Sequence, residues 1–133
     1  MPETNLPDIS DPATAPFWEG TRQSKIVVQA CAKCGYFRWP PGPLCTECLS
    51  SDFAWTEISQ TGTLWSYAVY HRAMAPRFAN DIPYTVALVE LDDGPRMYGR
   101  LVANGKNIEP GVAVRAVFQE IGPGVTVVNW EIE

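Results

Sequence analysis

The chain has no hydrophobic run long enough to cross a membrane, and its first ten residues lack the apolar core of a signal peptide. These two absences predict a cytoplasmic protein without a membrane partner. Positive charge is also scarce, because 10 lysines and arginines face 15 aspartates and glutamates, giving a net charge of −5. Nucleic-acid binding draws much of its affinity from neutralised phosphates, so this charge makes it an unlikely general function. The 133 residues fit one domain, or a small metal module plus one compact domain.

Cysteine is rare as well, and the four cysteines form two pairs within a short stretch of chain. They are Cys31, Cys34, Cys45 and Cys48. Two such C-x2-C turns supply the four thiolates of a tetrahedral, closed, structural Zn²⁺ site. Gly35 follows the first pair and tolerates the left-handed backbone that these turns often need. Two disulfides are the alternative, which a reducing compartment disfavours.

The sequence offers few groups for catalysis by this chain alone. With four thiolates on zinc, no position on the metal is open to water or substrate, and no cysteine is left as a nucleophile. The single histidine, His71, has no nucleophile or orienting carboxylate next to it in the sequence. Asp92 and Asp93 precede Gly-Pro between two predicted strands, which is typical of a turn.

The periodicity predicts a mainly β protein with one short N-terminal helix. The helix is expected to open at Pro16, with Thr14 or Ala15 near its cap, and to fade by Ser24. Short strands are expected around the cysteines, at residues 25–30, 36–39 and 53–55. Together they predict a zinc ribbon whose core is so small that the metal supplies much of its folding free energy.

Five longer strands are predicted after the ribbon, separated by turn residues rich in glycine, proline and aspartate. They cover residues 57–70, 84–91, 96–103, 112–120 and 125–131. Five strands with one long interruption predict a small closed barrel of the OB type, and a β-sandwich is the alternative. The expected organisation is therefore an N-terminal extension and helix at 1–25, a zinc ribbon at 26–55 and an OB-fold at 56–133.

The interruption between the first two long strands is a thirteen-residue loop, 71–83. Loops of this length in compact domains are usually functional or disordered, and disordered segments are poor in large apolar residues. This loop carries large and charged side chains, which favours an ordered contact loop; they are His71, Arg72, Met74, Arg77 and Phe78. Phe17 and Trp18 are a second large apolar display, and both packing on the chain's own core and docking to a partner are open for them.

With these features in place, the chain resembles the DUF35 family, whose members join an N-terminal helix, a rubredoxin-like zinc ribbon and a C-terminal OB-fold. The matching residues are Phe17-Trp18-Glu19-Gly20, the string C-A-K-C-G-Y-F-R-W-P-P from Cys31 to Pro41, Cys45 to Cys48, Thr61-Gly62-Thr63-Leu64, Val69-Tyr70-His71-Arg72 with Phe78, and Val86-Ala87-Leu88-Val89-Glu90-Leu91. The resemblance extends from about Phe17 to Phe118.

The resemblance implies a non-catalytic accessory subunit of a thiolase-superfamily enzyme that acts on an acyl-CoA. Such enzymes include thiolases, acyltransferases, archaeal hydroxymethylglutaryl-CoA synthase and steroid side-chain aldolases. The thiolase-like partner carries the reacting residues, and the small subunit helps to form or stabilise the acyl-CoA site. By analogy with thiolase dimers, the assembly is expected to be a heterotetramer or larger.

Within that expectation, the loop residues receive specific roles. Arg72 and Arg77 are expected to meet the phosphates of CoA or carboxylates of the partner, with His71 beside them at the interface. Met74, Phe78 and Tyr84 are expected to line a tunnel for the pantetheine or the acyl chain. The alternative function is single-stranded nucleic-acid binding by an OB-fold and zinc ribbon, with aromatic residues as a stacking platform; they would be Trp65, Tyr67 and Tyr98.

Overall fold

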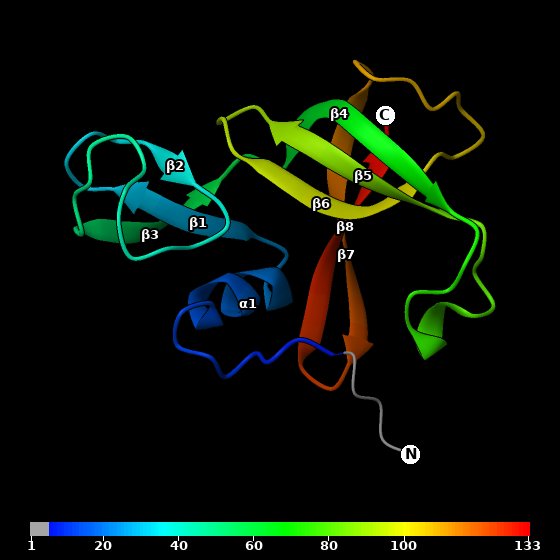
Figure 1. Ribbon diagram of the computed structural model, residues 1–133, viewed down its shortest axis with the longest axis horizontal. Coiled ribbons are helices and arrows are strands. Elements are labelled where there is room, and N and C mark those ends of the chain that lie inside the picture. Colours follow the sequence, from blue (N-terminus) through cyan, green and yellow to red (C-terminus); the bar gives the residue numbers. More distant parts are fainter. Residues whose placement is uncertain (1–5) are drawn as a thin grey trace.

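The computed structural model describes residues 6–133, and of Arg77 it describes the backbone only. It confirms a mainly β fold with one short α-helix (Figure 1). The elements before the barrel are α1 (Ala15–Arg22), β1 (Ile26–Cys31), β2 (Phe37–Arg38) and β3 (Phe53–Ile58). Those of the barrel are β4 (Thr61–Tyr70), η1 (Pro76–Phe78), β5 (Tyr84–Leu91), β6 (Arg96–Val102), β7 (Ala113–Gly122) and β8 (Val125–Ile132).

The strands form two sheets, one for the ribbon and one for the barrel. The ribbon is a three-stranded antiparallel sheet in the order β2-β1-β3. The barrel closes in the order β4-β5-β6-β8-β7, and its only parallel pair, β6 with β8, is held at just two positions, Leu101↔Trp130 and Val102↔Glu131. This closed five-stranded barrel agrees with the OB type expected from the sequence.

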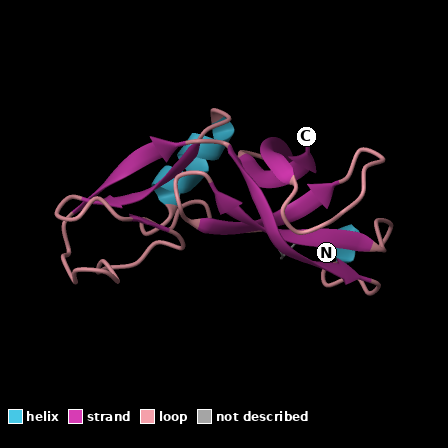
Figure 2. Cartoon of the chain, turned by 90° about the horizontal axis from the view of Figure 1, so that it is seen from above, coloured by secondary structure: helices cyan, strands magenta, loops and turns pink. Residues whose placement is uncertain are grey.

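Helix α1 lies between the ribbon and the β7–β8 hairpin, in contact with β1 and β8 (Figure 1). Pro16 occupies its first turn and Thr14 is the N-cap, as the sequence predicts. The helix ends at Arg22 with Gln23 as the C-cap, and Ser24 after it has a φ of 58°. Gly20 allows the helix to approach β1 closely, because a Cβ at this position would stand 2.7 Å from Cγ2 of Val27. Seen from above, the helix again lies between the loop-rich ribbon and the barrel strands (Figure 2).

One continuous hydrophobic core joins the helix, the ribbon and the barrel. Trp130 of β8 is fully buried at its centre, with Leu64 and Val89 of the barrel, and Phe17 of the helix belongs to the same cluster. The ribbon contributes Ile26 to this core. Because the three parts share one core, the helix and the ribbon fix each other's position on the barrel.

The predicted strand 57–70 is wrong as a single element. It is split at Ser59 and Gln60, so that β3 completes the ribbon sheet and β4 begins the barrel. The corner is held by the β5–β6 turn: the Asp93 carboxylate accepts a hydrogen bond from the Ser59 backbone N–H at 2.7 Å, and Asp92 accepts one from the Thr61 hydroxyl. Asp92 and Asp93 therefore serve the turn that the sequence predicts and fasten this corner as well.

Other boundaries differ by one to three residues. The ribbon strand expected at 36–39 is reduced to Phe37–Arg38, because the chain after it turns into the proline-rich loop. The strands of the β7–β8 hairpin end at Gly122 and Ile132, beyond the predicted 120 and 131. Among the described residues, no helix has the length and apolar character that a membrane crossing requires.

Candidate functional site

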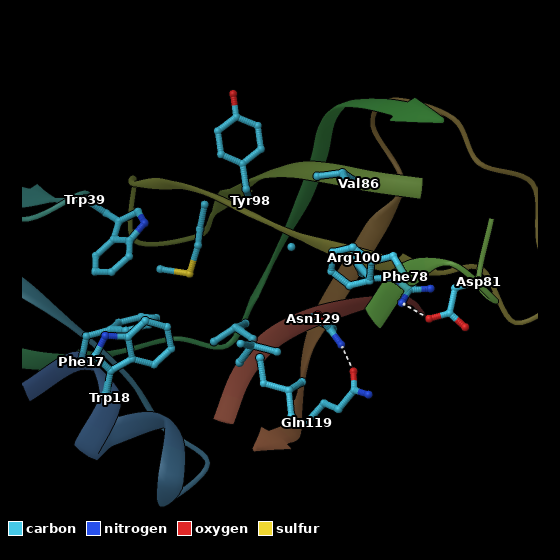
Figure 3. A pocket seen from close by; sticks show the side chains of 15 residues that line it. Phe17, Trp18, Trp39, Phe78, Asp81, Val86, Tyr98, Arg100, Gln119 and Asn129 are labelled. Atoms are coloured by element: carbon cyan, nitrogen blue, oxygen red, sulfur yellow. Dashed lines mark hydrogen bonds and ion pairs between the residues drawn. The ribbon is translucent and has the colours of Figure 1, made fainter. Parts of the chain in front are cut away.

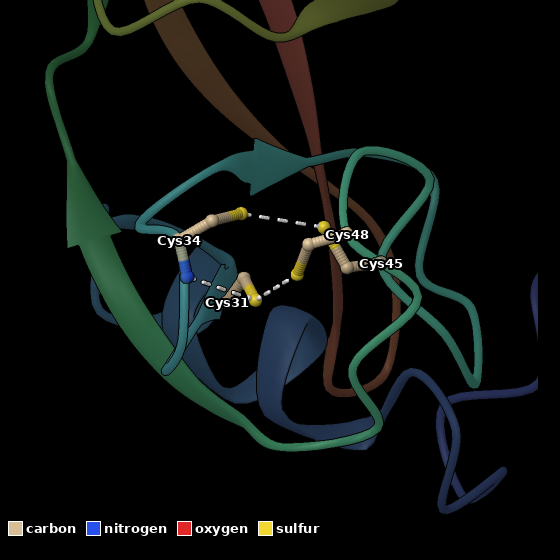
Figure 4. A group of neighbouring side chains, drawn as sticks. All are labelled: Cys31, Cys34, Cys45 and Cys48. Carbon is tan, nitrogen blue, oxygen red and sulfur yellow. Dashed lines mark hydrogen bonds between the residues drawn. The ribbon is translucent and has the colours of Figure 1, made fainter.

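The four cysteines converge at one end of the ribbon (Figure 4). Their sulfur atoms all lie within 4.8 Å of one another, with Cys31 Sγ 3.5 Å from Cys48 Sγ and Cys34 Sγ 3.6 Å from Cys45 Sγ. None of the four is in a disulfide. Four sulfurs at about 2.3 Å from a tetrahedral Zn²⁺ would lie about 3.8 Å apart, so the cluster fits a closed structural zinc site.

Local backbone geometry prepares the cysteines for a metal. Gly35 has a φ of +79°, and its N–H donates to the Cys31 carbonyl, which closes the first turn. The second turn repeats this arrangement with Leu49, at a φ of +66°, donating to the Cys45 carbonyl. Backbone N–H groups also point at sulfur, from Cys34 to Cys31 Sγ at 3.5 Å and from Glu47 to Cys45 Sγ at 3.4 Å.

Without a cation nearby, these contacts give the thiols different pKa values. The backbone N–H of Cys34 lowers the pKa of the Cys31 thiol to about 6. The pKa of Cys34 is instead raised to about 12, because burial and the neighbouring sulfurs outweigh the N–H of Tyr36, which acts in the opposite direction. Four adjacent thiols therefore do not ionise together on their own, and a divalent cation supplies the charge that lets them do so.

The contact loop 71–83 has an anchored part and an exposed part. Phe78 packs on Tyr84 with ring centroids 5.1 Å apart, and Tyr84 stacks on Tyr70 at 5.2 Å. Arg100 of β6 binds Asp81 at 3.1 Å and lies over the rings of Phe78 and Tyr84. The second half of the loop is thus fastened to the barrel.

The exposed part of the loop carries the other predicted contact residues. His71 and Arg72 are exposed, and Met74 is 66% exposed. The side chain of Arg77 lies outside the described part of the chain. The structure therefore separates Phe78 and Tyr84, which pack on the barrel, from His71, Arg72 and Met74, which face outward.

The two aromatic residues of the helix also have different environments. Phe17 is only 4% exposed, and its ring lies 4.2 Å from that of Trp39 in the ribbon. Trp18 is half-buried and meets Phe17 edge-on at 5.0 Å. In the chain by itself, Phe17 packs in the core, which is one of the two alternatives that the sequence left open. Of these two residues, only Trp18 exposes enough of its side chain to contact a partner.

A cavity of about 610 Å³ lies where the helix, the ribbon, the barrel and the anchored loop meet (Figure 3). One end, the aromatic end, is formed by Phe17, Trp18 and Trp39. The other end, the polar end, has two pairs of side chains that bond to each other. Arg100 forms a hydrogen-bonded ion pair with Asp81, and Asn129 donates a hydrogen bond to Gln119 at 2.6 Å. Of the residues singled out in the sequence as site candidates, Phe17, Trp18 and Phe78 line this cavity.

Tyr98, named for the nucleic-acid alternative, lines the cavity too, but sequence reasoning missed other lining residues, among them Arg100 and Asn129. Each is an ordinary strand residue without a local motif, and barrel closure alone brings β6 and β8 to the same cavity. The three aromatic residues proposed as a platform for nucleic acid do not all share one face of the sheet. In the strand register Tyr67 aligns with Ala87 and Gly99, whereas Tyr98 aligns with Leu88. Neighbouring positions in a strand point to opposite faces, so Tyr67 and Tyr98 project from opposite faces of the sheet.

Comparison with known proteins places both halves of the chain. Residues 18–54 match the family described as ChsH2, rubredoxin-like zinc ribbon domain, and residues 55–119 match ChsH2, C-terminal OB-fold domain. A solved structure titled "Ltp2-ChsH2(DUF35) aldolase" is 36% identical, with a TM-score of 0.82 over 95% of this chain and 98% of that one.

Two curated relatives extend well beyond the matched region. A "Probable enoyl-CoA hydratase alpha subunit" of Thermomonospora curvata is 41% identical over 113 residues, which are 84% of this chain and 35% of that protein. The "3-oxo-4,17-pregnadiene-20-carboxyl-CoA hydratase alpha subunit" of Mycobacterium tuberculosis is 31% identical over 131 residues, covering 98% of this chain and 41% of that protein. The chain thus spans well under half the length of these two relatives.

Proposed function

This chain belongs to the DUF35 family, and from that premise we propose that it is a non-catalytic accessory subunit of a thiolase-like enzyme acting on an acyl-CoA. The main support is the likeness to the solved Ltp2-ChsH2(DUF35) aldolase, whose name pairs a DUF35 chain with a second protein, Ltp2. The names of the two curated hydratase relatives, both alpha subunits, support a CoA thioester as the substrate class. The reaction of the complex would be thiolysis, condensation, acyl transfer or aldol cleavage.

The chemistry of the described residues favours a non-catalytic role. All four cysteines belong to the metal cluster, which leaves no sulfur as a nucleophile. His71 is exposed and, within the described part of the chain, its side chain has no hydrogen bond to a nucleophile or carboxylate. A catalytic histidine is normally oriented by such a partner, so the reacting residues belong to the other subunit.

The exposed part of the contact loop is the proposed contact with that subunit or with the bound acyl-CoA. Met74 offers an exposed apolar side chain, and Arg72 an exposed cation for carboxylates or phosphates. Arg77, named with Arg72 from the sequence, is proposed as a further cation. Phe78 anchors the loop to the barrel by packing on Tyr84, the first residue of β5. Trp18 is a second proposed anchor, at the edge of the helix.

The test is co-purification with a thiolase-like enzyme encoded beside this chain. We expect the two proteins to elute together as a heterotetramer or larger, and acyl-CoA turnover to require both. The variant Met74→Glu should weaken the association by about tenfold or more. Leu44→Glu is the matched control, because Leu44 is an exposed apolar residue of the ribbon, and it should leave association unchanged. Elution as separate proteins would refute the proposal.

A further inference from the structure

The cavity between the helix and the barrel has the size and chemistry of a small-molecule site. Its volume of about 610 Å³ lies within the usual range for ligand pockets, and it forms at the junction of separate structural units, where such pockets often occur. Its wall is mainly apolar and includes Val86 and Met97. Water in such a space would find few polar partners, so an apolar occupant is favoured over solvent.

The electrostatics of the polar end favour an uncharged occupant. Arg100 is the cation of the cavity wall, and it is already paired with Asp81 at 3.1 Å and lies over the rings of Phe78 and Tyr84. A phosphate or carboxylate at this end would compete with Asp81 for Arg100 and would be repelled by the Asp81 carboxylate at close range. The CoA headgroup and acidic peptide segments are therefore poor candidates.

The polar end nevertheless offers a hydrogen-bond donor to a neutral acceptor. Gln119 accepts from Asn129 through its Oε1, which leaves its amide nitrogen as a donor. A carbonyl oxygen is the neutral acceptor that this donor suits.

We propose that this cavity binds the uncharged acyl group of the thioester, with its hydrocarbon body against the aromatic end and a carbonyl oxygen at the polar end. The acyl group is chosen because the proposal rests on the proposed function, in which the substrate is an acyl-CoA. The headgroup then extends outside the cavity toward the partner. The accessory subunit in this way selects the acyl group and does not only hold the complex together.

Binding is measured on the zinc-loaded full chain alone, by equilibrium dialysis against three probes. Progesterone is a neutral ketone with fused rings, 2-dodecanone is a neutral ketone with a straight chain, and coenzyme A is the headgroup without an acyl group. At an ordinary ligand efficiency of about 0.3 kcal/mol per non-hydrogen atom, a fitting progesterone should bind with a Kd of about 10 µM and a fitting 2-dodecanone with a Kd of about 1 mM. The ketone that binds more tightly than its size predicts identifies a ring or a chain as the occupant.

Four variants locate the binding. Val86→Trp fills the cavity and should weaken ketone binding by about tenfold or more, and Ile121→Trp does so from another part of the wall if the first variant fails to retain zinc. Val102→Trp is the control, because Val102 is exposed on β6 and does not line the cavity. Gln119→Leu removes an amide donor and should weaken ketone binding by about fivefold.

The proposal is overturned if neither ketone binds, if coenzyme A binds as tightly as the better ketone, or if a folded Val86→Trp or Ile121→Trp variant binds like the unaltered chain. These results do not depend on a partner enzyme. A chain that co-purifies with a thiolase-like enzyme but binds no ketone would therefore refute the acyl cavity while leaving the accessory role intact.

Discussion

Replacing Phe17 by alanine tests whether the helix is part of the core or only an anchor for a partner. Phe17 is 4% exposed, its ring contacts Trp39 at 4.2 Å and Trp18 at 5.0 Å, and it belongs to the same core cluster as the ribbon and the barrel. Truncation of a buried phenylalanine typically costs 3–5 kcal/mol, so we expect a loss of about 3–5 kcal/mol in the free energy of unfolding. This is a large share of the ~5–15 kcal/mol that stabilises a typical domain.

The assay is urea unfolding of the zinc-loaded chain, followed by tryptophan fluorescence and by circular dichroism. Leu44→Ala is the matched control, since Leu44 is 48% exposed, and it should change the free energy of unfolding by no more than about 0.5 kcal/mol. A loss below about 1 kcal/mol for Phe17→Ala would refute the packing argument. If such a variant also lost its partner enzyme, Phe17 would be an anchor instead.

Three further predictions concern the metal, a close contact and a titrating group. Elemental analysis should find about one zinc per chain in the unaltered protein. Cys31→Ser should remove this zinc and leave the ribbon unfolded, and a well-folded, metal-free variant would contradict the zinc-ribbon assignment. Gly20→Ala should destabilise the chain by about 1–3 kcal/mol in urea unfolding, because the added methyl meets Val27, and an unchanged midpoint would show that the helix can shift. The hydrogen bond from Arg115 lowers the pKa of Glu131, so this carboxylate stabilises the fold above its ordinary pKa and stops doing so as pH falls through the lowered value. Glu131→Gln should therefore reduce Tm at pH 7 more than at pH 3. An equal reduction of Tm at both pH values would show that the charge of Glu131 does not stabilise the fold.

The metal site and most of the fold follow from local sequence patterns. Two C-x2-C pairs place their sulfurs by the geometry of single turns, so Cys31 and its three partners are found without tertiary information. The later strands show alternation and clear turn residues, and residues 84–91 were predicted with the bounds of β5. The corner at Ser59 was not predictable, because it is fixed by Asp92 and Asp93, more than thirty residues away.

The cavity is the part of the molecule that the sequence did not reveal. Its aromatic end combines the helix with Trp39 of the ribbon, and its polar end combines Arg100 of β6 with Asn129 of β8. These residues meet because the barrel closes through a short parallel pairing of β6 and β8, which no local pattern encodes. The length and content of the loop single out Phe78 as a contact residue, but they do not indicate the cavity that it lines.

The accessory role is tested most directly by comparing acyl-CoA turnover by the zinc-loaded chain, by the thiolase-like enzyme and by the two together. We expect no turnover by the chain alone, and turnover by the pair that greatly exceeds that of the enzyme. Thioester conversion by the purified 133-residue chain would contradict the accessory role.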